Sequence, residues 1–263
     1  MEQANKETRI TVVTVDMHPW ASIRRFAVFT VRYFDCNPLR LHNEECHCPL
    51  RVALTHVKNR TRFRAVAKPY AIINVNPQSI RWKLPGSPAR WPIGTVLDGD
   101  WDEARRIPID THWKIPSFSQ RFIQGLPWED TALFQRVYEP EFLRKGRVRG
   151  ADDLGQLARR YERVYDTLYE SIRQHGFLTP TLEQPDISFM YVHIGRAGEL
   201  LFTRGGNHRL GIALALGLRS VPVRVGVRHL QWQRTREAIK CDPQLGRTLH
   251  VHPDLLDLKH RKP

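Results

Sequence analysis

Two glycines and three polar residues interrupt an apolar stretch in LLFTRGGNHRLGIALALG, in the order Gly205, Gly206, Asn207, His208 and Arg209. The apolar run before them predicts a strand, and the run after them predicts a helix. A helix that begins here exposes backbone N–H groups without an intrahelical acceptor and carries partial positive charge. Glycine permits a close approach of the backbone to a ligand, and arginine adds a planar donor suited to phosphate oxygens. One interpretation of the pattern is therefore an anion-binding turn.

The same residues also fit a tight turn without a ligand, in which Arg209 faces solvent or pairs with a nearby carboxylate. An arginine in the first turn of a helix is unfavourable against the helix dipole unless an anion lies between them. The local pattern alone does not decide between these two interpretations.

A group of carboxylates, Asp98, Asp100, Asp102 and Glu103, occurs in the sequence DGDWDEAR. On an extended segment Asp100 and Asp102 share a face, because successive side chains alternate. Mg²⁺ binds one or two carboxylates together with phosphate oxygens, and phosphoryl transfer often uses a carboxylate base. We therefore expect Asp100 and Asp102 to hold Mg²⁺ and to act, with His208, as catalytic residues. The alternative is a loop whose acidic residues precede a helix.

The elements that must position the glycine turn are clearest after residue 150. Apolar residues recur at three- and four-residue spacing from Leu154 to Ile172, after the N-cap candidates Asp152 and Asp153 and before Gly176. This periodicity predicts one long helix with one apolar face. The runs SFMYVHIG and ELLFT then predict a β-hairpin that leads into the turn.

The sequence before residue 150 is less regular. RITVVTV, RFAVFTVRYF and YAIINV are typical of strands, whereas residues 35–62 and RWKLPGSPARWPIGTVL indicate irregular structure. SFSQRFIQGLPWEDTALFQRVY predicts two short helices separated by GLP.

The order of these elements resembles the ParB/sulfiredoxin superfamily over about residues 150–228, with RRIPID at 105–110 as a candidate first strand. The turn is similar to the Gly-Gly-Cys-His-Arg loop of sulfiredoxins, with Asn207 at the position of the reactive cysteine. It is also similar to the Asp-Gly-x-His-Arg loop of ParB-like free serine kinases, with Gly205 at the position of the Asp. The matching positions are Ser171, Ile172, His175, Gly176, Pro180, Gly206 to Arg209, Leu216, Gly217, Val221, Pro222 and Val223.

The resemblance implies an α+β fold with a ParB/sulfiredoxin-like mixed core and a nucleotide polyphosphate site. ATP, ADP or CTP, with Mg²⁺, would be held by Gly205, Gly206, Asn207, His208 and Arg209. Sulfiredoxin activity is not expected, because the amide of Asn207 cannot replace the reactive thiolate.

The function expected from these features is a nucleotide-dependent phosphotransferase or nucleotide hydrolase that acts on an unidentified acceptor. A nucleic-acid-binding protein or nuclease is one alternative, and a non-catalytic scaffold for a metabolite or protein is another. We expect a β-rich N-terminal extension packed on the core (1–95), the ParB/sulfiredoxin-like core (96–230) and a C-terminal tail (231–263).

The composition limits the partners and the location. The chain has 41 Lys and Arg against 27 Asp and Glu, a formal charge of +14, which favours a nucleotide, phosphorylated metabolite or nucleic acid as partner. No apolar run approaches the roughly 18 residues of a membrane span, and the first residues do not resemble a secretory signal. We therefore expect a cytoplasmic protein without a membrane partner. Zinc at Cys36, His42, Cys46 and Cys48 is disfavoured, because a single residue separates Cys46 from Cys48.

Overall fold

The computed structural model describes residues 49–85, 91–177, 190–203, 205–242, 244–245 and 252–259. All of them belong to one unit of the chain, Asn43–Pro263. The strands expected before residue 49 and the zinc candidates Cys36, His42, Cys46 and Cys48 lie outside the described residues.

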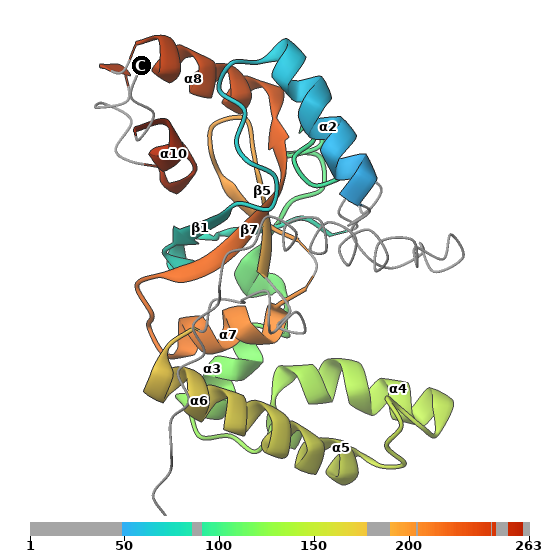
Figure 1. Cartoon of the computed structure of the whole chain (residues 1–263). Coiled ribbons are helices and arrows are strands. Elements are labelled where there is room, and N and C mark those ends of the chain that lie inside the picture. Colours follow the sequence, from blue (N-terminus) through green and yellow to red (C-terminus); the bar gives the residue numbers. More distant parts are fainter. Residues whose placement is uncertain are drawn as a thin grey trace, which may run out of the picture. The chain divides into compact units, whose positions relative to one another are not determined.

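Within the described residues, seven strands form one mixed sheet in the order β1-β7-β5-β6-β2-β4, with β3 also paired to β7 (Figure 1). The central neighbours β7 and β5 are parallel, and β5 is buried at every position. Burial on both faces is typical of a strand covered by helices on each side. The strands are β1 (Ile72–Val75), β2 (Trp82–Lys83), β3 (Val96–Leu97), β4 (Ile107–Pro108), β5 (Met190–Ile194), β6 (Leu200–Phe202) and β7 (Val221–His229).

Helices lie on two sides of the sheet (Figure 1). At the upper end in this view are α2 (Pro49–Arg62), α8 (Leu230–Cys241) and α10 (Leu256–Lys259). At the lower end are α3 (Pro116–Phe122), α4 (Glu139–Lys145), α5 (Leu154–Tyr161), α6 (Thr167–His175) and α7 (Asn207–Ala215). Side chains of α7 belong both to the apolar core of the sheet and to that of the other lower helices, so α7 lies between the sheet and these helices. Elsewhere in the described residues, 3-10 turns occur at Pro77–Ser79, Ile109–Thr111, Trp128–Asp130 and Pro253–Leu255.

The long helix predicted after residue 150 is present as α5 and α6, joined by the π-helical segment Glu162–Asp166. Asp153 caps it, since its side chain accepts a hydrogen bond from the Gln156 amide at 2.6 Å. At the other end Gly176 has a φ of 72°, a left-handed value that suits glycine. The expected order of helix, hairpin, glycine turn, helix and strand is thus confirmed.

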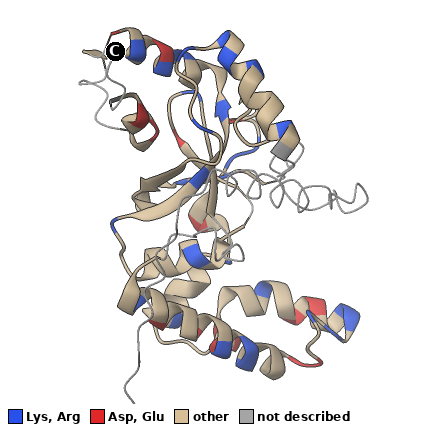
Figure 2. Cartoon of the chain, viewed as in Figure 1, with Lys and Arg blue, Asp and Glu red and all other residues tan. Residues whose placement is uncertain are grey.

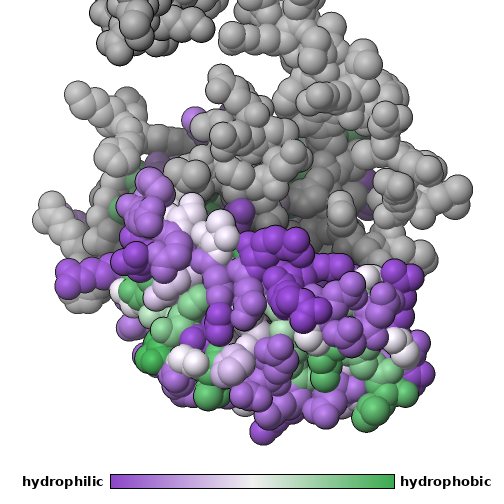
Figure 3. Space-filling view, turned by 90° about the horizontal axis from the view of Figure 1, so that it is seen from below, coloured by the Kyte–Doolittle hydropathy of each residue, from purple (hydrophilic) through white to green (hydrophobic). Residues whose placement is uncertain are grey.

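The outer face of the lower helices carries both signs of charge along α4, α5 and α6 (Figure 2). Seen from this side, the surface is largely hydrophilic with separate apolar patches (Figure 3). Exposed apolar side chains in this part of the chain include Ile123, Leu143 and Val164. Scattered apolar residues of this kind are ordinary on a protein surface.

Three expectations about organisation differ from the arrangement of the described residues. A boundary at residue 95 would divide the sheet, because β1 pairs with β7 and β2 pairs with β6. Residues 49–62, expected to be irregular, form α2, in which Val52 and Asn59 are buried on one face. The expected C-terminal tail begins within α8, whose Trp232 and Ile239 join the core. The described residues include no helix with the length and apolar content needed to cross a bilayer.

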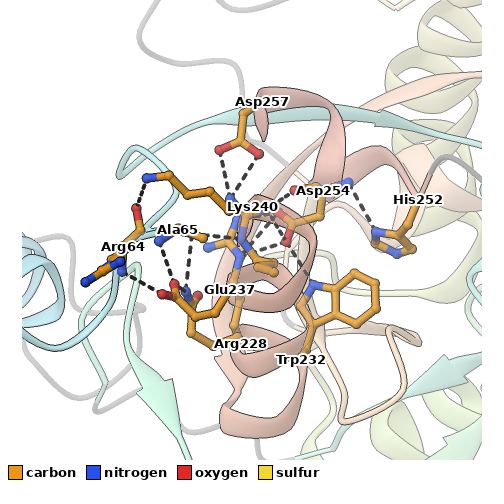
Figure 4. A network of polar contacts seen from close by, with 11 residues as sticks. Arg64, Ala65, Arg228, Trp232, Glu237, Lys240, His252, Asp254 and Asp257 are labelled. Atoms are coloured by element: carbon orange, nitrogen blue, oxygen red, sulfur yellow. Dashed lines mark hydrogen bonds and ion pairs between the residues drawn. The ribbon is translucent and has the colours of Figure 1, made fainter. Parts of the chain in front are cut away.

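A buried ionic cluster anchors residues 252–259 to the sheet and to α8 (Figure 4). The Asp254 carboxylate accepts hydrogen bonds from Arg228 Nε at 3.0 Å, Arg236 Nη1 at 3.1 Å and Trp232 Nε1 at 3.0 Å. Arg236, fully buried, also donates to Asp257 at 2.8 Å. Burial alone would raise the pKa of Asp254, but the nearby guanidinium groups of Arg228 and Arg236 lower it to about 2. In this cluster each buried cation is matched by a carboxylate of the chain itself.

Candidate anion-binding site

The glycine turn follows the end of β6 and opens α7. Gly205 and Gly206 have φ values of 82° and 68°, a region that L side chains rarely adopt. A Cβ added at Gly206 would lie 2.5 Å from Met190 Cγ, so this position also lacks room for a side chain. The Leu210 amide bonds the Gly206 carbonyl at 2.8 Å, whereas the first three amides of α7 precede any intrahelical acceptor.

Lys83 of β2 reaches this turn from a neighbouring strand. The parallel pairing of β2 with β6 places Lys83 opposite Phe202, near the end of β6. Its side-chain nitrogen donates to Asn207 Oδ1 at 2.8 Å and lies 2.7 Å from His112 Nε2. Lys83 is only 9% exposed, although it carries an ammonium group. The sequence did not indicate a role for this residue.

His112 completes the contact as a neutral ring. Because the Lys83 ammonium has donors only, His112 Nε2 must accept, which leaves the proton on Nδ1. That Nδ1 atom is buried and has no hydrogen-bond partner within the described ranges. A buried donor without a partner is costly unless a ligand or solvent satisfies it. His112 therefore offers an unused hydrogen bond beside Lys83.

Positive charge accumulates around this contact. Burial, followed by the charge of Lys114, lowers the pKa of Lys83 to about 8. Burial and the charges of Lys83 and Lys114 lower the pKa of His112 to about 4. The pKa of Lys114 is itself lowered, first by burial and then by Arg149. At pH 7 the site thus holds a charged Lys83 and a neutral His112.

Carboxylates do not balance this charge in the described part of the chain. Neither Lys83 nor Lys114 forms an ion pair with an acidic side chain described by the structure. Glu141 raises the pKa of Lys114 from a distance, but its own carboxylate is 2.6 Å from Lys145 Nζ. Half-buried cations without a paired carboxylate favour an anionic ligand.

His208 is placed differently from the prediction. Its ring packs among aromatic rings of the lower helices, with centroids 4.2 Å from Tyr165 and 5.6 Å from Phe118. Burial, aided by Lys114 and Arg149, lowers its pKa to about 4, so it is neutral at pH 7. The Nε2 atom is buried without a hydrogen-bond partner among the residues described. The contacts with Tyr165 and Phe118 support a packing role for the ring, and the expected phosphate-binding and catalytic roles of His208 stay predictions.

Arg209 occupies the third position of α7 and is half-buried. Burial lowers the pKa of its guanidinium. Its expected contact with a phosphate stays a prediction. Together with Gly205, Gly206 and Asn207, it lies at the start of the same helix, so four of the five predicted binding residues remain grouped at the turn.

Asp100 and Asp102 lie away from the turn. Asp102, 1% exposed, accepts hydrogen bonds from the Arg196 amide at 2.8 Å and from Arg196 Nη2 at 2.7 Å. Asp100 is 2.9 Å from the same guanidinium. Arg196 belongs to the loop between β5 and β6, whereas Gly205 follows the other end of β6, so the two groups occupy opposite ends of this strand.

These contacts do not support the expected Mg²⁺ and catalytic roles of Asp100 and Asp102, which stay predictions. The segment turns at residues 101–105 and is not extended, so the two side chains do not alternate along a strand. Burial tends to raise the pKa of Asp102, but hydrogen bonds from Arg196 outweigh it and keep the pKa below its ordinary value. Both carboxylate oxygens of Asp102 accept hydrogen bonds from Arg196. Asp100 and Asp102 therefore hold the β5–β6 loop in place. Among the described residues, no group of three or more His, Cys, Asp or Glu side chains is arranged to hold a metal ion.

Comparisons with protein-family models, with curated proteins and with solved structures found no significant match to this chain.

Proposed function

We propose that this protein binds the phosphate groups of a nucleotide at the N-terminal end of α7. The observation that carries this proposal is Lys83, a largely buried cation held by Asn207 and His112 without an ion-paired carboxylate among the described residues. Lys114 adds a second cation, and the first amides of α7 add donors with the favourable end of the helix dipole. Together they would surround a phosphate with positive charge and hydrogen-bond donors.

A nucleotide is the phosphate compound that the sequence favours. The helix, hairpin, glycine turn, helix and strand occur in the order on which the resemblance to the ParB/sulfiredoxin superfamily rests. ATP, ADP and CTP are the candidates that this resemblance implies. The nucleotide-dependent phosphotransferase or hydrolase activity rests on the resemblance alone, because the hydrogen-bond partners of Lys83 are Asn207 and His112, and neither is a carboxylate base.

The residues at the turn do not fit a protein-bound Mg²⁺ ion. Lys83, Lys114 and the neutral His112 provide positive charge and nitrogen atoms, whereas Mg²⁺ requires oxygen ligands and favours carboxylates. We therefore propose that phosphate binding at this site depends on the cations of the chain and not on a metal that the chain holds.

Titration calorimetry with ADP, ATP, CTP and tripolyphosphate, each with and without Mg²⁺, tests the proposal. We expect binding of at least one nucleotide in the absence of metal. Lys83→Gln should weaken it by about 10- to 100-fold, equivalent to the roughly 1.5–3 kcal/mol of a charged hydrogen bond. Lys58→Gln, which removes an exposed lysine of α2, is the matched control and should bind like the wild type. No heat from any of these ligands with folded protein would reject the proposal.

A further inference from the structure

A second concentration of positive charge occurs at a cavity between α2, the segment that follows it and α8. The cavity has a volume of about 430 Å³. Four of its lining residues are lysines or arginines, and within the described part of the chain none is acidic; the cations are Arg60, Arg64, Lys68 and Lys240. Phe63 and Val66 add half-buried apolar surface to the same lining. This volume and mixture of groups are suitable for a ligand that carries both phosphate and an apolar ring.

The charge continues beyond the cavity along the sequence. Between Glu45 and Asp98 there is no acidic residue, whereas there are nine basic ones: Arg51, Lys58, Arg60, Arg62, Arg64, Lys68, Arg81, Lys83 and Arg90. Figure 2 shows Lys and Arg along α2 with no Asp or Glu on this helix. The 14 residues of α2 span about 21 Å at the helical rise. A surface of this length is more than a single phosphate group can contact.

A carboxylate beside this surface, that of Glu237, is engaged with the backbone. Glu237 accepts hydrogen bonds from the amides of Arg64 at 2.7 Å and Ala65 at 2.5 Å. Lys240 donates to the Arg64 carbonyl, as Figure 4 shows. These contacts hold the segment that follows α2. None of the four lining cations forms an ion pair with an acidic side chain that the structure describes.

We propose that this cavity and α2 bind the backbone of a single-stranded nucleic acid. The cations on α2 and the segment after it would contact successive phosphates, and Phe63 with Val66 would contact a base. A lone nucleotide would leave most of the cations along α2 unused, so a strand accounts for the extent of the charge. The proposal is independent of the α7 site, because the cavity is lined by other elements.

Fluorescence anisotropy with a labelled oligothymidine of about 16 nucleotides, a site size within the range of single-strand binders, tests the proposal. We expect Arg60→Gln/Arg64→Gln/Lys68→Gln to lower the affinity about 100-fold at about 0.1 M salt, since three phosphate contacts are lost. The slope of log affinity against log salt should become shallower by about 2. The matched control is Arg136→Gln/Arg144→Gln/Arg159→Gln, which removes equal charge from exposed positions on the lower helices and should lose less than about fivefold through screened, long-range effects.

Cross-linking to the wild-type protein gives a readout that does not depend on how the variants fold. An oligonucleotide with 5-iodouracil should cross-link within residues 60–68, which include Phe63. Cross-links confined to the segments of Lys83, His112 or α7 would overturn the proposal, as would equal losses in the two triple variants. Equal affinity for a blunt duplex, or competition by ADP as effective as that by the oligonucleotide, would also overturn it.

An anionic membrane is the remaining partner to separate, because Leu50, Leu54 and Val57 of α2 are exposed beside these cations. Sedimentation with phosphatidylserine-containing vesicles distinguishes it. Vesicle binding that the first triple variant abolishes, without any oligonucleotide binding, would reject the single-strand proposal in favour of a lipid surface. Oligonucleotide binding without vesicle binding would support it.

Discussion

The protein contains two groups of buried or half-buried cations that differ in what balances their charge. Arg228 and Arg236 share the buried carboxylate of Asp254, which accepts from both guanidinium groups. Lys83 and Lys114 lie near each other at the start of α7 and have no ion-paired carboxylate in the described ranges. A buried charge needs a partner, either within the chain or from outside it. The first group therefore serves the fold, and the second group fits a ligand.

The largest expected effect is on the matched cluster. Asp254→Asn keeps the shape of the side chain but removes the charge that balances Arg228 and Arg236. Leaving buried cations without their carboxylate should lower the free energy of unfolding by about 3–5 kcal/mol. Asp257→Asn is the control, because Asp257 is 40% exposed and should cost about 1 kcal/mol or less. Urea denaturation measures both; equal losses would remove the distinction between a buried and a partly exposed carboxylate.

A smaller effect is expected at the β5–β6 loop. Asp102→Asn removes a buried carboxylate that accepts three kinds of hydrogen bond from Arg196. The free energy of unfolding should fall by about 1–3 kcal/mol. The affinity for nucleotide should stay within about twofold of the wild type, because Asp102 and the glycine turn lie at opposite ends of β6. A loss of nucleotide binding with little change in urea denaturation would instead support the Mg²⁺-binding role first expected for Asp102.

The pH dependence of binding tests the role of Lys83. Burial and Lys114 lower the pKa of Lys83 to about 8, so this lysine loses its proton between pH 7 and pH 9. The terminal phosphate of ADP titrates near pH 6 and keeps its charge over that range. Affinity for ADP should therefore fall about tenfold from pH 7 to pH 9, in proportion to the charged fraction of Lys83.

A Lys83 variant and the stability of the ligand-free protein test the same pKa. Lys83→Arg should bind with little pH dependence over the same range, since arginine remains charged. Without ligand, stability should change in the opposite sense: the folded protein releases the Lys83 proton more readily than the unfolded chain, so stability rises as pH increases through about 8. Binding that is flat from pH 7 to pH 9 in the wild type would argue against Lys83 as a ligand contact.

The sequence predicted local elements well and distant contacts poorly. The periodicity from Leu154 to Ile172 predicted α5 and α6, and the glycine pair predicted the turn before α7. Lys83 was missed because its role comes from the pairing of β2 with β6, segments that are far apart in the chain. No local motif marks that pairing, since β2 has only two residues.

The predictions for His208 and Asp102 lack support for the same reason. Each residue type fits the predicted chemistry, but its tertiary contacts favour packing or an ion pair. His208 packs on Tyr165 and Phe118, and Asp102 pairs with Arg196, and neither partner adjoins it in the sequence. Side chains that can serve either packing or chemistry are assigned only when their neighbours are known.

The most direct measurement is thermal unfolding of the wild type and of Lys83→Gln, in chloride and in dilute tripolyphosphate at equal ionic strength. Removing an unbalanced cation should leave the melting temperature in chloride equal to or above that of the wild type, because the glutamine amide can still donate to Asn207. Tripolyphosphate should raise the melting temperature of the wild type by binding the folded state, and it should not raise that of Lys83→Gln. A marked fall for Lys83→Gln in chloride, with an equal response of both proteins to tripolyphosphate, would contradict an anion site at the start of α7.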